Sequence, residues 1–166
     1  MKNKVIRICL IIMFACSCRD IGTHSYSKNT NDKREKEVCY IMRAYYINHT
    51  SNDLTSKERK VLQKMKKDFY YEPRESDNPA FVIPGPSWTF KGPLNLTKYF
   101  ELLQKLREKE PSYRGPVFDF VDKYKKGDEI FYYKSNQLSW NNLMGIEGYV
   151  IIRDNKICYD WITAVN

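Results

Sequence analysis

The chain has 166 residues, of which 42% are hydrophobic and 29% are charged, and its formal net charge is +8. Lysine and arginine are interspersed with aspartate and glutamate, which predicts a mixed, solvated surface and argues against a nucleic-acid partner, because such a partner requires a clustered basic face. We find no internal repeat and no low-complexity block, so repeat architectures are excluded.

Residues 1–18 have the pattern of an export signal. Lys2, Lys4 and Arg7 form a basic start, residues 8–15 form an uninterrupted apolar run, and small residues precede the two cysteines at its end. The apolar run is much shorter than the roughly 20 residues that cross a bilayer as a helix. We therefore predict a signal peptide over residues 1–18 and no transmembrane helix there.

This segment resembles a bacterial lipoprotein signal, in which a peptidase cuts before a cysteine that becomes lipid-modified. Cutting before Cys18 or before Cys16 both fit, although Ala15 and Met13 replace the Leu, Val or Ile that the family prefers three residues upstream. The resemblance implies a fatty-acyl (palmitate-type) anchor in a membrane of the cell envelope, facing the periplasm or the surface. The alternative is an ordinary secretory signal cut near Ser17, which yields a secreted or periplasmic soluble protein.

The remaining cysteines favour Cys18 as the lipidated residue. The mature chain then keeps Cys39 and Cys158, an even pair in an oxidising compartment, whereas an anchor at Cys16 leaves Cys18 as an odd thiol. A Cys39–Cys158 disulfide would contribute roughly 4–5 kcal/mol in the chain-entropy model. The alternative is two buried free thiols that pack as small hydrophobic side chains.

Residues 19–31 are polar and predict a flexible tether, and residues 32–166 suit one domain. Asp32 followed by Glu35 fits a capping box, after which apolar residues recur with helical spacing up to residue 45. Thr55 followed by Glu58 gives the same signal for a second helix, which ends before Pro73. The apolar stripes of both helices predict packing against a core.

Four prolines between residues 79 and 93 predict a stiff loop with at most one edge strand. A third helix is predicted over residues 96–109 and ends before Pro111. Pro116 and Gly127 bound a short fourth helix. Residues 118–120 also alternate as in a strand, and this alternative stays open.

The last third of the chain is rich in β-forming residues. Residues 129–134 predict one strand, and residues 148–153 and 156–164 flank Asp154-Asn155, a pair typical of a hairpin turn. The sequence thus predicts an α+β fold, with N-terminal helices followed by a small antiparallel β-meander that ends in a hairpin.

Both faces of this hairpin carry apolar residues. Val150 and Ile152 fall on one face, and Tyr149 and Ile151 fall on the other. We expect one face to pack on the helices and the other face to pack on something else.

Three motifs in the C-terminal region carry a resemblance: residues 127–130 (GDEI), Ser139-Trp140, and residues 145–154 (GIEGYVIIRD) with Asn166. Over about forty residues they resemble the C-terminal module of a family of small uncharacterised bacterial proteins. The resemblance implies a β-hairpin ending and implies no activity or site. The glycines at 145 and 148 are predicted to serve turn and packing geometry.

One group of acids is a candidate catalytic cluster, because glycan-cleaving enzymes work with two carboxyl groups and no histidine. Its members are Asp119, Asp122, Asp128 and Glu129. Lysines interleave with them, so a charged turn explains the pattern equally well. The chain has two histidines and no nucleophile elbow, metal-ligand spacing or phosphate-binding glycine loop. We therefore expect no catalytic residue, metal or cofactor.

Trp88 and Phe90 lie in the stiff Pro-Gly-Pro segment. Rigid aromatic side chains flanked by polar residues are typical of surfaces that contact proteins or glycans. The alternative is that both rings cover the core.

The sequence therefore predicts an exported, lipid-anchored envelope protein that is not an enzyme and has a binding role, of the immunity or inhibitor type by analogy of architecture. The alternatives are a carboxylate-dependent envelope hydrolase that acts on glycans and a structural or assembly lipoprotein. The expected partners are the membrane, through the N-terminal lipid, and a protein or glycan of the envelope.

Overall fold

The computed structural model describes residues 28–50, 54–74 and 82–166. The chain divides into two units, Met1–Asn31 and Asp32–Asn166. The predictions for the signal and for lipidation at Cys16 or Cys18 lie outside the described residues. Within these residues, no helix combines the length and the apolar character needed to cross a bilayer.

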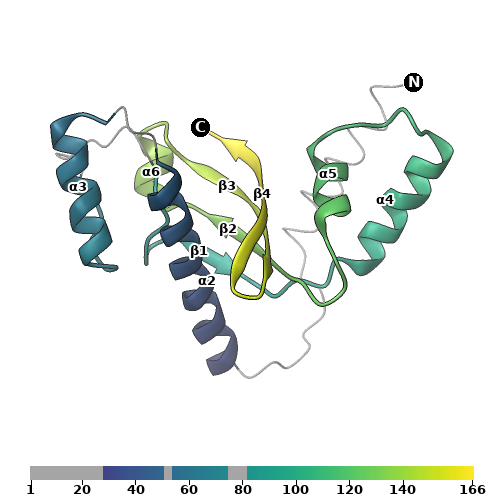
Figure 1. Cartoon of the computed structure of the whole chain (residues 1–166), viewed down its shortest axis with the longest axis horizontal. Coiled ribbons are helices and arrows are strands. Elements are labelled where there is room, and N and C mark those ends of the chain that lie inside the picture. Colours follow the sequence, from purple (N-terminus) through teal and green to yellow (C-terminus); the bar gives the residue numbers. More distant parts are fainter. Residues whose placement is uncertain (1–27, 51–53, 75–81) are drawn as a thin grey trace. The chain divides into compact units, whose positions relative to one another are not determined.

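The second unit contains one antiparallel sheet whose strands follow one another in chain order, which confirms the predicted α+β fold with a C-terminal meander (Figure 1). The strands are β1 (Thr89–Lys91), β2 (Glu129–Lys134), β3 (Ile146–Arg153) and β4 (Lys156–Val165). Strand β1 is the edge strand expected in the proline-rich segment. Asp154 and Asn155 form the predicted turn between β3 and β4, with φ angles of 50° and 58°. Positive φ at both central residues is what a two-residue type I′ hairpin requires.

Five helices are described: α2 (Lys28–His49), α3 (Ser56–Lys67), α4 (Thr97–Lys109), α5 (Pro116–Lys123) and α6 (Gln137–Asn141). The capping box of α3 is confirmed, because Thr55 and Glu58 exchange side-chain and backbone hydrogen bonds. Residues 118–120 lie within helix α5, so the predicted helix is confirmed there and the strand alternative is wrong. Helix α6 was not predicted.

The predicted start of the first helix is wrong. Helix α2 begins at Lys28, inside the segment predicted as a tether, so Asp32 is not its N-cap. The side chain of Glu35, the expected partner in that capping box, instead accepts a hydrogen bond from the backbone N–H of Gly92 at 3.3 Å. The capping-box pattern of Asp32 and Glu35 does not mark a helix start here, because helix α2 continues through both residues and the Glu35 side chain binds Gly92.

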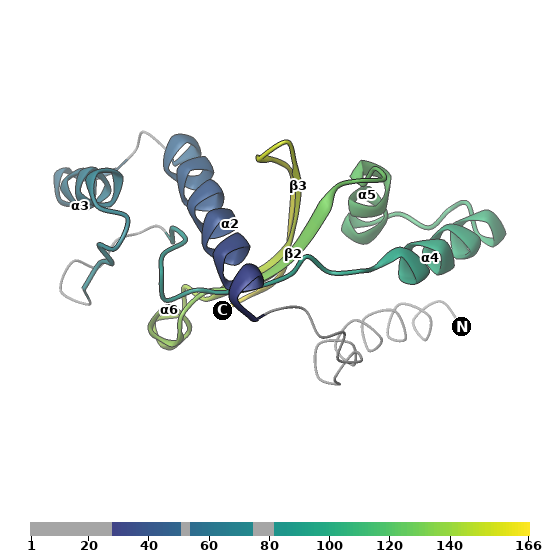
Figure 2. The ribbon, with the colours of Figure 1, turned by 90° about the horizontal axis from the view of Figure 1, so that it is seen from below.

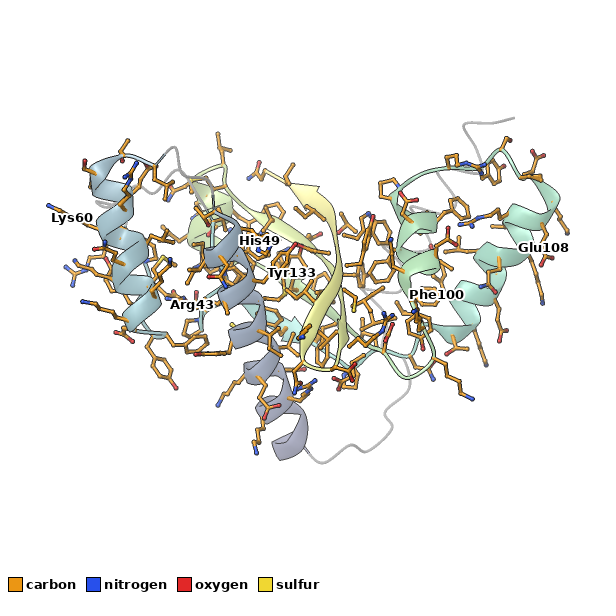
Figure 3. All side chains as sticks on the ribbon, in the orientation of Figure 1. Arg43, His49, Lys60, Phe100, Glu108 and Tyr133 are labelled. Atoms are coloured by element: carbon orange, nitrogen blue, oxygen red, sulfur yellow. The ribbon has the colours of Figure 1, made fainter. Side chains whose placement is uncertain are left out.

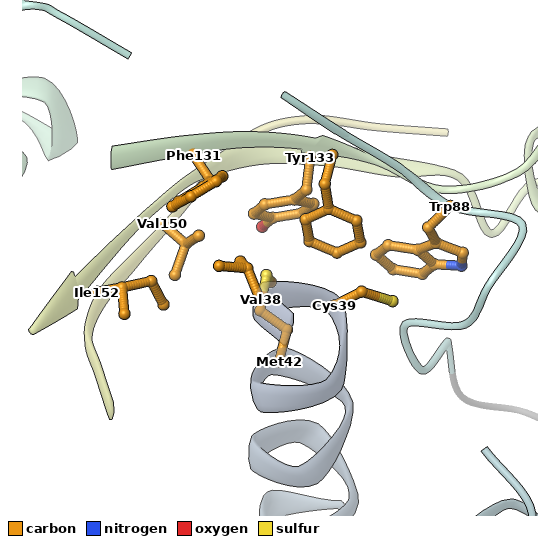
Figure 4. Packing of buried hydrophobic residues seen from close by; sticks show 9 residues of the cluster. Val38, Cys39, Met42, Trp88, Phe131, Tyr133, Val150 and Ile152 are labelled. Carbon is orange, nitrogen blue, oxygen red and sulfur yellow. The ribbon is translucent and has the colours of Figure 1, made fainter. Parts of the chain in front are cut away.

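Helix α2 covers one face of the sheet (Figures 1 and 4). Val38 and Met42 on α2 are fully buried and face Phe131, Val150 and Ile152 on the strands. The predicted assignment of Val150 and Ile152 to one face of the hairpin is therefore confirmed.

Helices α4 and α5 cover the opposite face of the sheet, and Figure 2 shows them on the side away from α2. Phe100 and Leu103 on α4 and Phe120 on α5 pack with Ile130 and Ile151 of the strands. The expectation that the second face packs on something other than helices is wrong. Helix α2 precedes β1 in the chain, and helices α4 and α5 follow it. The helix before β1 and the helices after it therefore bury opposite faces of the sheet.

A buried arginine connects α2 to the chain segments around it. Arg43 is 2% exposed, and within the described residues its guanidinium donates hydrogen bonds to backbone carbonyl oxygens, at distances from 2.8 to 3.4 Å. The carbonyl groups belong to Met65, Asp68, Tyr71 and Pro84. Burial lowers the pKa of Arg43. The Met65 carbonyl lies in the last turn of α3, where a helix leaves carbonyl groups without an intrahelical donor, and Arg43 supplies one. The Asp68 carbonyl also accepts a hydrogen bond from the Tyr71 backbone N–H.

We predict that Arg43→Met lowers the free energy of unfolding by about 3–5 kcal/mol, because it leaves several buried carbonyl groups without a donor. Urea unfolding followed by circular dichroism measures the change. The control is Arg59→Met, since Arg59 is exposed and its Nε donates to the Leu54 carbonyl at 3.0 Å. It should cost less than about 1 kcal/mol. Equal losses in the two variants would show that the contacts of Arg43 do not stabilise the fold.

Candidate functional site

The four carboxylates proposed as a catalytic cluster do not converge on a common site. Asp119 is exposed on α5. Each of the others faces a different arginine: Asp122 Oδ1 lies 2.8 Å from Arg107 Nη1, Asp128 Oδ2 lies 2.6 Å from Arg153 Nη2, and Glu129 Oε2 lies 3.1 Å from Arg34 Nε. The hydrogen bonds from Arg153 hold the pKa of Asp128 below its ordinary value. A paired-acid mechanism needs two carboxyl groups facing one substrate, so this geometry gives the hydrolase alternative no support.

Metal-binding geometry is also missing from the part of the chain that the structure describes, where no three histidine, cysteine or acidic side chains gather to hold an ion. His49 is exposed at the end of α2, stacks on Tyr45 with ring centroids 4.1 Å apart, and places Nδ1 2.7 Å from the Tyr45 carbonyl.

Trp88 and Phe90 lie in the core rather than on an exposed contact surface. They are 7% and 6% exposed, and both rings pack against Tyr133 of β2. The structure therefore corrects the idea that these two side chains contact a partner and agrees with the alternative that they cover the core. The physical reason is the pairing of β1 with β2, which turns Phe90 inward toward α2.

Cys39 and Cys158 do not form a disulfide. Cys39 packs between α2 and one face of the sheet, whereas Cys158 packs against the cluster on the opposite face. The Cys39 thiol donates to the Gly85 carbonyl at 3.2 Å, and burial raises its pKa to about 12. The alternative of two buried free thiols holds in part, since both thiols are free and lie on opposite faces of the sheet, but only Cys39 is buried and Cys158 is half-buried.

A partly buried cluster of three polar side chains, which no sequence motif indicated, links the sheet to α2, and Tyr133 is its fully buried member. Asp160 of β4 accepts a hydrogen bond from the Tyr133 hydroxyl of β2 at 2.6 Å and another from the Tyr46 hydroxyl of α2. Figure 3 shows Tyr133 in the interior of the domain. An acidic residue within the otherwise apolar stretch of β4 was the available signal for this cluster.

Gly148 makes this contact between non-adjacent strands possible. Strand β3 lies between β2 and β4, so the Tyr133 side chain must cross β3 to reach Asp160. Tyr133 pairs with Gly148, and a Cβ at this glycine would lie 2.8 Å from the Tyr133 hydroxyl and 2.2 Å from the Trp161 carbonyl. The prediction that Gly148 serves packing geometry is thus confirmed.

The electrostatics of the cluster follow from its burial. Removal from water raises the pKa of Asp160, and the hydrogen bonds from Tyr133 and Tyr46 offset only part of this effect. The same burial raises the pKa of both tyrosines. Both hydroxyl groups therefore stay protonated and act as donors, which defines the cluster as a structural link.

A hollow beside Trp88 is too small to be a ligand site by itself. The described residues that line it include Arg43, Glu72, Asn136 and Met144, and its volume is about 70 Å³. Pockets that bind small molecules occupy roughly 300–1,000 Å³. Arg43 already donates its hydrogen bonds to backbone carbonyls, so the hollow offers no free cation from that residue.

The end of the sheet where β4 finishes is the most exposed apolar region that the structure describes. Four of the seven exposed large hydrophobic side chains within the described ranges belong to it, and we call them the β4-end patch: Leu138, Leu143, Ile162 and Val165, which are 43%, 73%, 45% and 70% exposed. Ile162 and Val165 lie on β4, where Val165 pairs with Ile146 of β3, and Asn166 binds Gly145 and Trp140, which connects the end of β4 to the α6 segment that carries Leu138 and Leu143.

Two backbone features make this patch suitable for a partner. Strand β4 is the last strand of the sheet, and among the described residues no strand pairs with its outer edge. Leu143 has a φ angle of 56°, a left-handed conformation that is uncommon for a bulky residue, and its side chain is held in solvent. Backbone strain retained at an exposed apolar side chain supports a hypothesis of function.

No family model, curated protein or solved structure matches the chain. The resemblances of the N-terminal and C-terminal segments therefore stay predictions.

We predict that Asp160→Ala lowers the free energy of unfolding by about 2–4 kcal/mol, because it leaves the hydroxyl groups of buried Tyr133 and half-buried Tyr46 without this acceptor. Asp160→Asn keeps one oxygen acceptor and should cost less. Urea unfolding measures both changes, and equal losses would contradict the role of the acceptor.

The pH dependence of the same variants gives a second prediction. The pKa of Asp160 is higher in the folded chain than in the unfolded chain, so its contribution to stability is complete below the unfolded pKa, about 3.9, and declines as the pH rises through the folded pKa. Asp160→Asn does not titrate. Its stability relative to the wild type should therefore rise as the pH increases above about 4. A difference that does not change with pH would contradict a raised pKa.

Proposed function

We propose that this chain is an exported, lipid-anchored protein of the cell envelope that binds a protein partner through the outer edge of β4, in the manner of an inhibitor or immunity protein. The observation that carries the proposal is the β4-end patch beside an edge strand without a neighbour. The envelope location rests on the signal in residues 1–18 and on its resemblance to lipoprotein signals.

The chemistry of the edge favours a protein over a glycan. An edge strand presents a row of backbone N–H and C=O groups, which an added strand of another chain satisfies completely. Ile162 and Val165 are exposed aliphatic side chains on that strand, and aliphatic side chains contribute most when a partner's apolar side chains cover them. Aromatic side chains are the usual platforms for sugar rings, and the β4-end patch has none.

The outer edge of β4 is protected along only part of its length. Proteins block unused edges with prolines, inward-pointing charges, β-bulges or short strands. Asp160 is an inward-pointing acid in the middle of β4, and a β-bulge shifts the register opposite Glu147 and Gly148. The last four residues, Ile162, Thr163, Ala164 and Val165, have no charge and no proline. A partner strand would therefore pair with this short, bulged end of β4.

Crosslinking tests the proposal. A photoreactive amino acid at Val165 of the full chain should crosslink to one envelope protein in the producing cells. The same amino acid at Leu102, which is 46% exposed on α4, is the control and should not crosslink to that protein. Mass spectrometry identifies the adducts. Identical adducts from both positions, or none from Val165, would exclude β4 as the binding edge.

The partner, once purified, allows a quantitative test. Val165→Asp should weaken its binding by about 10-fold or more, whereas Leu102→Asp should leave the affinity unchanged. Binding should slow hydrogen exchange of backbone amides in residues 162–165, as strand addition requires. An inhibitor also lowers the activity of its partner, and Val165→Asp should relieve that inhibition.

A further inference from the structure

The exposed surface of α3 is strongly basic. Six of its twelve residues are lysine or arginine, and all six are exposed: Lys57, Arg59, Lys60, Lys64, Lys66 and Lys67. The single acid in the helix, Glu58, is 7% exposed and belongs to the capping box with Thr55. It therefore does not neutralise the outward surface.

Helical spacing separates the basic face from the buried face. Val61 and Met65 are buried and pack against Ile47 of α2 and Ile83. Lys57, Lys60, Lys64 and Lys67 recur at intervals of three and four residues, so they lie on one face that excludes the two buried positions. Figure 3 shows Lys60 extending outward from α3.

Exposed tyrosines lie next to the last lysines of α3. Phe69 follows the helix and contacts the rings of Tyr40 and Tyr70, each with a centroid separation of 5.4 Å. Tyr40 and Tyr70 are 61% and 78% exposed. Asp68 at this end uses its carboxylate to accept a hydrogen bond from the Tyr70 backbone N–H at 2.9 Å. Lysines flanked by exposed tyrosines are typical of surfaces that meet the headgroup region of a bilayer.

We propose that this basic face of α3, together with Tyr40 and Tyr70, binds the anionic surface of a lipid bilayer. The lysine ammonium groups lie at the lipid phosphates, and the two tyrosines enter the headgroup region. The aromatic pair favours a bilayer over an acidic polymer, because a polymer provides charge without an apolar boundary. This surface is separate from the β4-end patch and does not depend on the protein partner proposed for β4.

Vesicle binding of the full chain tests this proposal. The probes are vesicles of phosphatidylcholine alone and vesicles that also contain phosphatidylglycerol, and co-sedimentation gives the ratio of the two partition coefficients. Residues 1–18 are the same in every variant, so changes in this ratio report on the substituted surface. The test variant is Lys60→Gln/Lys64→Gln/Lys67→Gln. The matched control is Lys98→Gln/Lys105→Gln/Lys109→Gln, which removes the same charge from exposed lysines of α4.

We expect the α3 variant to lower the anionic-to-neutral ratio on the order of 100-fold, and the α4 variant to lower it less than about threefold. Raising the salt concentration should weaken wild-type binding, since the charges are solvent-exposed. Tyr70→Ala should weaken binding further at high salt, where the charges are screened. Equal effects of the two triple variants would overturn the proposal. A second contradicting outcome is that polyglutamate displaces the wild-type protein completely from anionic vesicles and that Tyr70→Ala does not change vesicle binding.

Discussion

The fold depends on one partly buried carboxylate that joins three elements from distant parts of the chain. Asp160 on β4 accepts hydrogen bonds from Tyr133 on β2 and from Tyr46 on α2. Each tyrosine would leave an unpaired buried hydroxyl without it, and such a group costs about 1–3 kcal/mol. Gly148 lets the Tyr133 side chain cross β3. The cluster therefore fixes both the position of α2 on the sheet and the alignment of strands that are not neighbours.

Arg43 of α2 likewise joins distant segments of the chain through hydrogen bonds. Its guanidinium joins the end of α3 and the segment near Pro84 through backbone carbonyls alone, so these connections depend little on the identity of the neighbouring side chains. A buried polar group is unfavourable unless all its hydrogen bonds are made. Asp160 accepts hydrogen bonds from two hydroxyl groups, and Arg43 donates to four backbone carbonyl groups. We therefore assign both groups a structural role, and the features that point to function lie on the surface.

Two surfaces carry the proposed functions, and they differ in chemistry. The β4-end patch is uncharged and ends in an open strand edge, which suits an extended segment of a protein. The basic face of α3 is charged and has tyrosines at its margin, which suits a bilayer surface. A protein attached near its N-terminus to a membrane gains from a domain surface that also binds the membrane, because the anchor already raises the local concentration of lipid.

The sequence by itself determined the features that depend on neighbouring residues. Thr55 and Glu58 start α3, Asp154-Asn155 closes the hairpin, and alternation assigns Val150 and Ile151 to opposite faces. Only the tertiary structure decided that Cys39 and Cys158 lie apart, that Trp88 is buried, and that helices cover both faces of the sheet. The physical reason is that capping and turn geometry are set within a few residues, whereas burial depends on which distant segments pack together, and the Asp160 cluster joins residues 46, 133 and 160.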